Sequence, residues 1–515
     1  MSTAQHRPPP VPAAAGLARG SALGMAGAVA NGLLAFALTV VVGRALGPAG
    51  AGVFFAAAAL FTIASNTLEL GADTGLVRAL AAARATGRLE DLRPTVRAAV
   101  LPVLAASVLC SAGVAAAAPW LARTFLPGAG PGGAADLLRV LAAALPFGAL
   151  TAVALGGVRG LGRVAPVVLV ENVGKPFSRV VLAALVALAG GSALMMAAAW
   201  VLPVLAGAVV AGVQLARLLP ARRPGAATGA LPPRALAAPF WRFSAPRAVA
   251  ATVEVLSATV GLLLVSALAG SADAGVYAAA ARYVVAGSLV LTAVRLVAAP
   301  AVAQAMAQRD RHAASDLHLT STVWVVLASW PPFVLALAFP APLLSAFGPG
   351  FEDGATALAL LAAGMLVSLA AGNVQTVQLM SGGSGVNLAV VLGSLAVNAG
   401  LCLLLVPAHG VTGAAAAWAV CLVLENLLTA ADVRLRAGVS VVGQPVLLAA
   451  AVAGAAYGGG ALAARTVLGD GAVGLLCAAA SGTLAYALLL LLARDRLGLP
   501  ALVAALRGTT TAPTT

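Results

Sequence analysis

Residues 165–190 read APVVLVENVGKPFSRVVLAALVALAG, an apolar run that is long enough to cross a bilayer but carries charges in its interior. Glu171, Lys175 and Arg179 are spaced so that an α-helix would place them on one face, with the acid N-terminal to its cation. Pro176 lies between Lys175 and Arg179 and removes one backbone hydrogen bond there, which predicts a weakened or kinked helix. Ionisable groups at membrane depth normally face a bundle interior or a wet cavity. The stretch therefore predicts either an ion pair that only holds helices together or the polar lining of a translocation path.

The composition is that of a membrane protein. The 515 residues are 61% hydrophobic and only 9% charged, with a mean hydropathy of +1.02, whereas a soluble chain carries about 25% charged residues. A water-soluble enzyme is therefore excluded. The four cysteines each lie alone in an apolar run, and no histidine is spaced to complete a metal site, so we expect neither a metal nor a cofactor.

Apolar runs between arginine, proline and glycine punctuation predict an all-α polytopic protein of about 14 transmembrane helices. The expected spans are 20–42, 51–72, 98–118, 137–157, 166–190, 193–217, 247–268, 276–300, 318–340, 355–379, 385–406, 411–431, 443–463 and 471–493. The expected domains are a cytoplasmic N-terminal tail (1–19), a first six-helix bundle (20–217), a basic cytoplasmic linker (218–246), a second six-helix bundle (247–433), two additional transmembrane helices (434–493) and a cytoplasmic tail (494–515).

The positions of the basic residues predict the orientation of the chain. Of the 30 basic residues, 22 fall in tails and loops on one side of the membrane, four fall on the other side, and four lie within spans. Lysine and arginine accumulate in cytoplasmic loops, so both termini are predicted to be cytoplasmic. This distribution explains the net charge of +14 without nucleic acid as a partner.

An internal repeat divides most of the chain into two halves. Residues 47–58 (GPAGAGVFFAAA) align with 270–281 (GSADAGVYAAAA) at an offset of 223, and Ala197–Trp200 aligns with Ala415–Trp418 at an offset of 218. The equivalent pairs include Gly47/Gly270, Gly52/Gly275, Val53/Val276 and Phe54/Tyr277. Duplicated halves are common in transporters, with the substrate site between them near the midplane. The last two expected spans fall outside the repeat.

Three segments resemble a known family. Residues 43–54 (GRALGPAGAGVF) look like the loop after the first span of oligosaccharide flippases of the Wzx-like polysaccharide transporter family. Residues 70–78 (LGADTGLVR) resemble the end of their second span, and residues 404–416 (LLVPAHGVTGAAA) resemble their outer loop between spans eleven and twelve. The resemblance covers roughly residues 18–435.

This family shares a superfamily with MATE-type exporters and lipid II flippases. The resemblance implies a MATE-like fold with a V-shaped cavity between two helical bundles. It also implies movement of an undecaprenyl-diphosphate-linked oligosaccharide across the bacterial cytoplasmic membrane by alternating access, for cell-surface polysaccharide export. The partners implied are the lipid-linked glycan and membrane lipids, with a glycan polymerase or glycosyltransferases as further candidates.

A flippase of this kind needs cations for the diphosphate, and arginine suits phosphate because its planar group makes bidentate bonds. The candidate substrate-binding residues are Arg44, Glu171, Lys175, Arg179, Arg282 and Arg295. Two of them have plainer readings, since Arg44 could be an interfacial anchor and Arg295 could extend to the inner membrane surface. Candidates for ion coupling or for charge pairing are Glu69, Asp73, Glu254 and Glu425.

Signatures of catalysis are missing from the sequence. It contains no phosphate-binding G-x-x-x-x-G-K-[ST], no H-E-x-x-H and no G-x-S-x-G, so we expect no catalytic residues and no enzyme activity. Three alternatives remain open. They are a MATE-type drug/cation antiporter, in which carboxylates should dominate the site, a polytopic glycan polymerase or transferase, and a scaffold for a glycan assembly complex.

Overall fold

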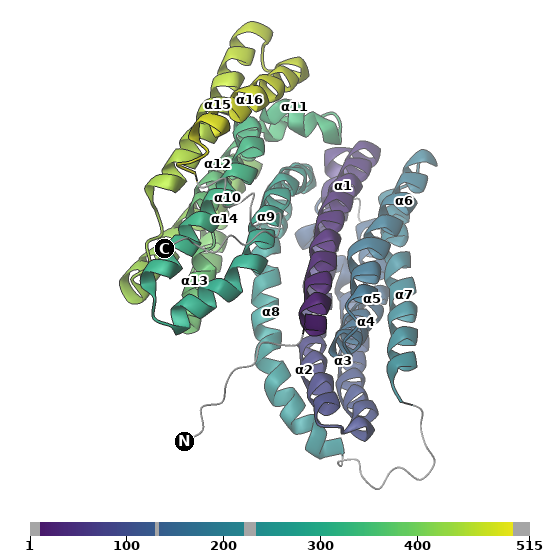
Figure 1. Ribbon diagram of the computed structural model, residues 1–515. Helices are drawn as coiled ribbons and strands as arrows, with labels where there is room; N and C mark the ends of the chain where they lie inside the picture. The colour runs from purple at the N-terminus through teal and green to yellow at the C-terminus, as the bar shows by residue number, and fades with distance from the viewer. Residues whose placement is uncertain (1–10, 129–132, 221–232, 498–515) are drawn as a thin grey trace, which may run out of the picture. The chain divides into compact units, whose positions relative to one another are not determined.

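The computed structural model describes residues 11–128, 133–220 and 233–497, which are almost entirely helical and contain no strand (Figure 1). Among them are 11 helices that are long and apolar enough to cross a membrane. The predicted all-α polytopic class is therefore confirmed. Parts of both predicted tails (1–10 and 498–515) and of the predicted linker (221–232) lie outside the described residues.

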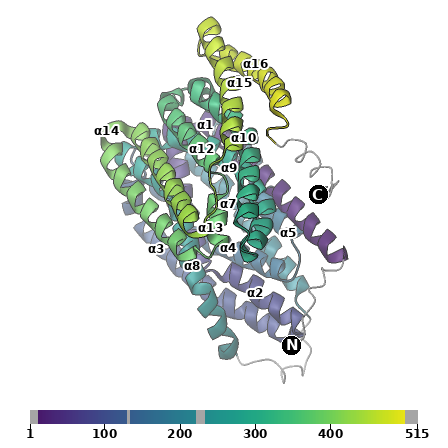
Figure 2. The same ribbon diagram turned by 60° about the vertical axis from the view of Figure 1, so that its left-hand side comes forward.

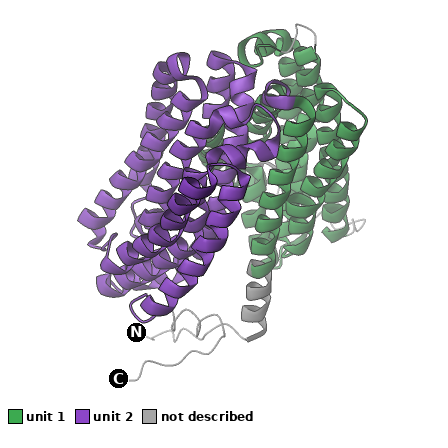
Figure 3. Ribbon diagram, turned by 90° about the horizontal axis from the view of Figure 1, so that it is seen from above, with its two compact units in different colours: residues 1–46, 53–259 green, residues 47–52, 260–515 purple. Residues whose placement is uncertain are grey.

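The chain forms two compact units, which Figure 3 colours separately. Unit 1 comprises residues 1–46 and 53–259, and unit 2 comprises residues 47–52 and 260–515. The longer helices up to residue 269 are α1 (Val11–Leu68), α2 (Ala72–Ala85), α3 (Leu92–Phe125), α4 (Gly133–Gly160), α6 (Lys175–Leu188), α7 (Ala193–Leu218) and α8 (Pro233–Ala269). The α-helices that follow, of which α11 and α13 are short, are α9 (Ser271–Ala307), α10 (Arg311–Ala338), α11 (Pro340–Leu344), α12 (Ala355–Ala371), α13 (Val374–Met380), α14 (Ser384–Asp432), α15 (Gln444–Leu468) and α16 (Ala472–Ala493). The domain boundaries expected from the sequence stay a prediction.

All of the expected spans coincide with helix, but two pairs of them merge. Helix α1 continues through the break that was expected near Gly47, where the chain kinks with φ 64° and ψ −178°. Helix α14 continues in the same way through Gly410, with φ 52° and ψ −134°. Both glycines adopt positive φ, which residues with a side chain rarely do. The expected short loops are thus kinks within long helices.

Helix α4 is the centre of unit 1, where it packs against α2, α3 and α7. Two glycines on α4 allow α2 to approach closely. A Cβ atom at Gly156 would lie 2.5 Å from the carbonyl oxygen of Asp73, and one at Gly160 would lie 2.8 Å from that of Leu76. Small residues at this spacing let helix backbones come together in membranes. The α2–α4 contact positions Asp73 for the site described below.

Several arginine-rich segments meet at one end of unit 1. Arg84 on α2 donates to the carbonyl of Leu161 in the loop after α4. Arg93 near the start of α3 donates through Nε to the carbonyl of Pro220, just beyond α7, at 2.7 Å. The loops after α2, α4 and α7 are all predicted to be cytoplasmic from their arginines. The fold therefore gathers, at one end, segments that the sequence assigns to the same side of the membrane.

In unit 2, α10 packs against α9, α12 and α15. The two helices outside the repeat, α15 and α16, form a hairpin, and they lie side by side in both views (Figures 1 and 2). Phe339, at the end of α10, is fully buried against Ala461 and Ala478 of this hairpin. Tyr486 donates its hydroxyl to the carbonyl of Leu327 at 2.7 Å. The additional pair is thus an integral part of the core of unit 2.

Candidate functional site in unit 1

The charged stretch at residues 165–190 is not one continuous α-helix. A short helical turn, α5 (Ala165–Val167), leads into a π-helical segment (Val168–Gly174), and α6 begins at Lys175. Pro176 has no N–H to donate to the carbonyl one turn earlier, so the widened turn lies where the proline disrupts the regular bonding. The predicted weakening of this helix is confirmed. Such π-helical turns occur frequently at functional sites.

Glu171 and Lys175 form the ion pair that their spacing predicts. Lys175 Nζ lies 2.7 Å from Glu171 Oε2, and the exposed fractions of the two side chains are 10% for the lysine and 44% for the glutamate. The lysine stem lies against α7, where a Cβ atom at Gly207 would be 2.9 Å from Lys175 Cδ. The close contact between the lysine stem and Gly207 positions the ammonium group of Lys175 next to Glu171, which is the more exposed partner of the pair.

Arg179 makes a different contact from the one its spacing suggests. Its guanidinium carbon lies 3.8 Å from the centre of the Trp200 ring on α7, a cation–π geometry. Its Nε also donates to the Trp200 carbonyl at 3.4 Å, a long hydrogen bond. Trp200 in turn packs edge to face on Phe61 of α1, with ring centres 4.9 Å apart. Spacing along the chain does not predict a role for Trp200, although this residue ends one of the repeated blocks of sequence.

The acids at the end of the second expected span join the same site. Glu69 interacts electrostatically with Asp73, Glu171 and Lys175. Asp73 Oδ2 lies 3.7 Å from Nη2 of Arg159 on α4. The sequence places Arg159 in the loop just after the span expected at 137–157, and no sequence signal predicts its role in this site. We refer to Glu69, Asp73, Arg159, Glu171, Lys175 and Arg179 as the unit 1 charge cluster; it contains three acids and three cations.

The other candidate residues lie elsewhere. Arg44 on α1 and Glu254 on α8 are exposed residues of unit 1. Arg282 and Arg295 are half-buried on α9 of unit 2. Glu425, on α14 of unit 2, is half-buried and hydrogen-bonds to Ser394. None of these five is a member of the unit 1 charge cluster, and their roles in substrate binding or ion coupling stay predictions.

Comparison with known proteins gives one family and several structures of similar fold. A family model described as polysaccharide biosynthesis protein matches residues 17–306. The lipid II flippase MurJ in an inward closed conformation is similar, with a TM-score of 0.68 and 11% identity, over 91% of this chain and 98% of that one. An inward-facing multidrug resistance transporter of the MATE family has a TM-score of 0.65 and 16% identity, over 80% of this chain and 94% of that one.

A MOP superfamily transporter from Pyrococcus furiosus is also similar, with a TM-score of 0.55 and 16% identity, over 82% of this chain and 95% of that one. No curated protein matches the chain by sequence. At these identities the solved structures show the fold alone, and they confirm the predicted MATE-like fold. The family model covers more than half of the chain. This multi-pass membrane protein with a MATE-like fold therefore belongs to the family of polysaccharide biosynthesis proteins.

Proposed function

We propose that the protein is a flippase that moves an undecaprenyl-diphosphate-linked oligosaccharide across the bacterial cytoplasmic membrane by alternating access, without catalysing a chemical reaction. The observation that carries this proposal is the unit 1 charge cluster, set within helices of a chain that belongs to a polysaccharide biosynthesis family. Charged groups inside membrane helices are costly and commonly mark substrate pathways. A diphosphate headgroup is the part of this substrate that needs cations.

In this mechanism the acids of the cluster keep its cations neutralised until the substrate arrives. Glu171 is the more exposed partner of Lys175, so its carboxylate can leave and a phosphate oxygen can replace it on the ammonium group. Arg179 is held face-on by Trp200, which leaves the edge of the guanidinium group to donate to phosphate. Exchange of one anion for another spares the membrane interior an unpaired cation, which would be strongly unfavourable.

The remaining candidates have roles in the same cycle. Arg44, Arg282 and Arg295 are further candidate ligands for the diphosphate or for the glycan at other stages of the movement. Glu254 and Glu425, together with Glu69 and Asp73, are candidates for proton or sodium coupling. Both termini are proposed to be cytoplasmic on the basis of the arginine distribution. Glycosyltransferases would supply the lipid-linked glycan, and a polymerase would consume it on the other side.

The test is translocation of a fluorescent lipid-linked oligosaccharide in proteoliposomes, with headgroup exposure measured on each face. We expect Arg179→Ala to abolish translocation while the amount of folded protein stays near that of the wild type. A matched control is Arg139→Ala, because Arg139 forms an ion pair of 2.8 Å with Asp136 in which both side chains are about half exposed. If Arg179→Ala removes folded protein and translocation in equal measure, the residue only holds helices together and the proposal fails.

A MATE-type drug/cation antiporter is the second candidate, and the three acids of the charge cluster favour it. Uptake of a cationic dye by the same proteoliposomes separates the two functions. Movement of the dye without movement of the lipid-linked glycan would replace the flippase proposal. A polytopic glycan polymerase or transferase would instead show turnover of a sugar donor by the purified protein.

A further inference from the structure

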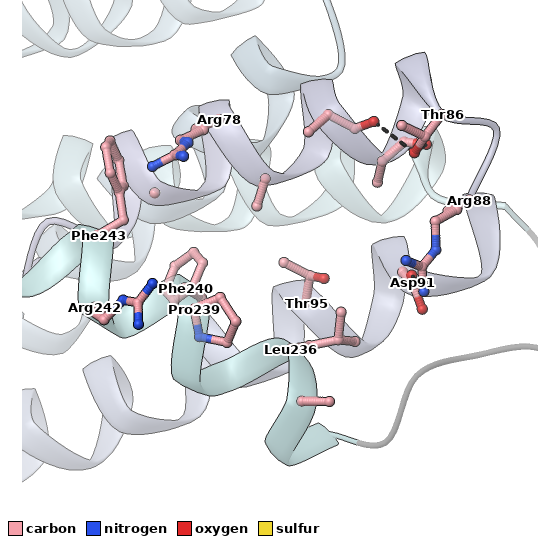
Figure 4. A pocket seen from close by; sticks show the side chains of 15 residues that line it. Arg78, Thr86, Arg88, Asp91, Thr95, Leu236, Pro239, Phe240, Arg242 and Phe243 are labelled. Carbon is pink, nitrogen blue, oxygen red and sulfur yellow. Dashed lines mark hydrogen bonds and ion pairs between the residues drawn. The ribbon is translucent and has the colours of Figure 1, made fainter.

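A second polar site lies in unit 1 outside the charge cluster. It is a cavity of about 550 Å³ between α2, the start of α3 and the first part of α8. Ligand pockets in proteins commonly measure about 300–1,000 Å³, so the cavity is large enough for a headgroup. Figure 4 shows Arg78 and Arg242 towards one end of the cavity and Arg88 with Asp91 towards the other.

The charge of this cavity is positive. Arg88 Nη2 is neutralised by Asp91 Oδ2 at 2.8 Å. Arg78 lies over the Phe243 ring, with 4.4 Å between its guanidinium carbon and the ring centre. Arg78 and Arg242 are both exposed, and within the described ranges neither has a carboxylate partner. Two guanidinium groups that have no carboxylate partner among the described residues thus line one cavity, which favours an anionic ligand.

The floor of the cavity is aromatic and apolar. Phe240 is buried and Phe243 half-buried, both on the first part of α8. Gly75 on α2 allows the close approach, because a Cβ atom there would lie 2.9 Å from the Phe240 ring. The neighbouring Trp241 donates its indole N–H to the Ala98 carbonyl at 3.2 Å. Aromatic residues beside arginines are typical of the boundary between a membrane and water.

We propose that this cavity binds the phosphate headgroup of a membrane lipid. Arg78 and Arg242 bind the phosphate, while Phe240 and Phe243 contact the first apolar part of the lipid. The phosphate can belong to a resident anionic phospholipid or to an isoprenoid-linked substrate, since both present the same chemistry to the arginines. Because this site is separate from the charge cluster, the inference does not rest on the proposed translocation.

Unit 2 contains a cavity that serves as an internal comparison. It measures about 460 Å³ and is lined by Arg309, Arg311, Arg436 and Asp432, of which the last two form an ion pair at 2.7 Å. Its other lining residues are Met306, Ser381–Gly383 and Ala437, none of which is aromatic. Both cavities can attract an anion, but only the one in unit 1 combines that charge with an aromatic floor. Selectivity for a phosphate carried by a lipid over free phosphate should therefore belong to unit 1.

The experiment measures the thermal unfolding midpoint of the full-length protein in a non-ionic detergent during titration with four probes. The probes are dioctanoylphosphatidylglycerol, farnesyl diphosphate, inorganic pyrophosphate and, as a zwitterionic control, dioctanoylphosphatidylcholine. Each variant is titrated in the same way, namely Arg78→Ala/Arg242→Ala, Arg242→Gln and the control Arg97→Ala. Arg97 is an exposed arginine of α3 that does not line the cavity.

We expect phosphatidylglycerol or farnesyl diphosphate to raise the unfolding midpoint of the wild type and of Arg97→Ala. In the double variant, the lipid concentration that gives half of the maximal rise in the unfolding midpoint should increase at least about tenfold, because each arginine supplies a charge-assisted hydrogen bond. The stronger of the two lipids identifies the source of the phosphate. An equal effect of pyrophosphate, or a double variant that responds like the wild type, would overturn the proposal. Since both arginines are exposed, the variants should fold, and Arg242→Gln provides the same test with one change.

Discussion

Gly52 and Gly275 occupy equivalent positions in the two sequence repeats, and each packs against the backbone of the segment that contains the other. A Cβ atom at Gly52 would overlap the carbonyl oxygen of Ser271, and one at Gly275 would overlap that of Pro48. Pro48 and Ser271 are themselves separated by the repeat offset of 223, so the contact is reciprocal. All four residues belong to unit 2, which includes residues 47–52 of α1. The contact therefore joins residues 48–52 of α1 to the start of α9 within unit 2.

The first prediction concerns this contact. We expect Gly275→Ala to lower the free energy of unfolding by about 1–3 kcal/mol, since the new methyl group meets backbone that cannot move aside independently. Thermal unfolding in detergent, followed by tryptophan fluorescence, measures the change. Gly400→Ala on α14 is the control, because a Cβ atom there meets nothing within 4 Å. Equal stability of the two variants would mean that the close approach does not exist in the folded protein.

The second prediction concerns the support beneath Lys175. Gly207→Ala places a methyl group against the lysine stem and should displace the ammonium group from Glu171. Translocation should fall by about tenfold or more, because small displacements of a positioned group have large effects on rate. Gly212→Ala on the same helix has open space around it and should transport normally. If both variants transport equally well, the position of Lys175 is not critical for movement of the substrate.

The third prediction concerns Arg179 and Trp200. A double-mutant cycle with Arg179→Ala and Trp200→Leu should give a coupling energy of about 1–2 kcal/mol in thermal unfolding, as expected for a cation–π contact out of water. Trp200→Phe keeps an aromatic face and should retain part of that coupling. Strictly additive effects of the two substitutions would show that the arginine does not stack on the ring.

The fourth prediction concerns the kink of α14. Asp273 on α9 accepts a hydrogen bond of 2.9 Å from the N–H of Val411, where the helix resumes after Gly410. Loss of this cap in Asp273→Ala should lower the free energy of unfolding by about 1 kcal/mol. Asp273→Asn keeps an acceptor oxygen and should lose less, so thermal unfolding of the pair isolates the hydrogen bond. An Asn variant as unstable as the Ala variant would point to the charge, acting on the helix N-terminus, as the main contribution.

The fold could be predicted from the sequence to a large extent, because the information is local. Each expected span is an apolar run whose length matches the membrane, and each run became helix. Glycine and proline also marked the breaks at Gly47 and Gly410 correctly, although whether a break becomes a loop or a kink depends on contacts such as that of Asp273. The disturbance at Pro176 followed directly from its missing N–H.

The site could be predicted only in part. The Glu171–Lys175 pair lies within one segment, and spacing along the chain was sufficient to predict it. Arg179 follows at the same spacing, yet it contacts Trp200 on another helix. Arg159 joins the cluster through Asp73 because two glycines bring α2 and α4 together. Such partners lie far apart in sequence, and hydropathy carries no information about which helices adjoin.

By itself, the sequence determined that this chain is a helical membrane protein with charges inside its fifth span, because the length and polarity of each apolar run are properties of the run alone. Only the tertiary structure decided which charges meet, which arginine stacks on tryptophan, and that α8 closes a basic cavity over α2. Those outcomes depend on how closely helix backbones approach, and glycines set that distance at positions that look unremarkable in the sequence.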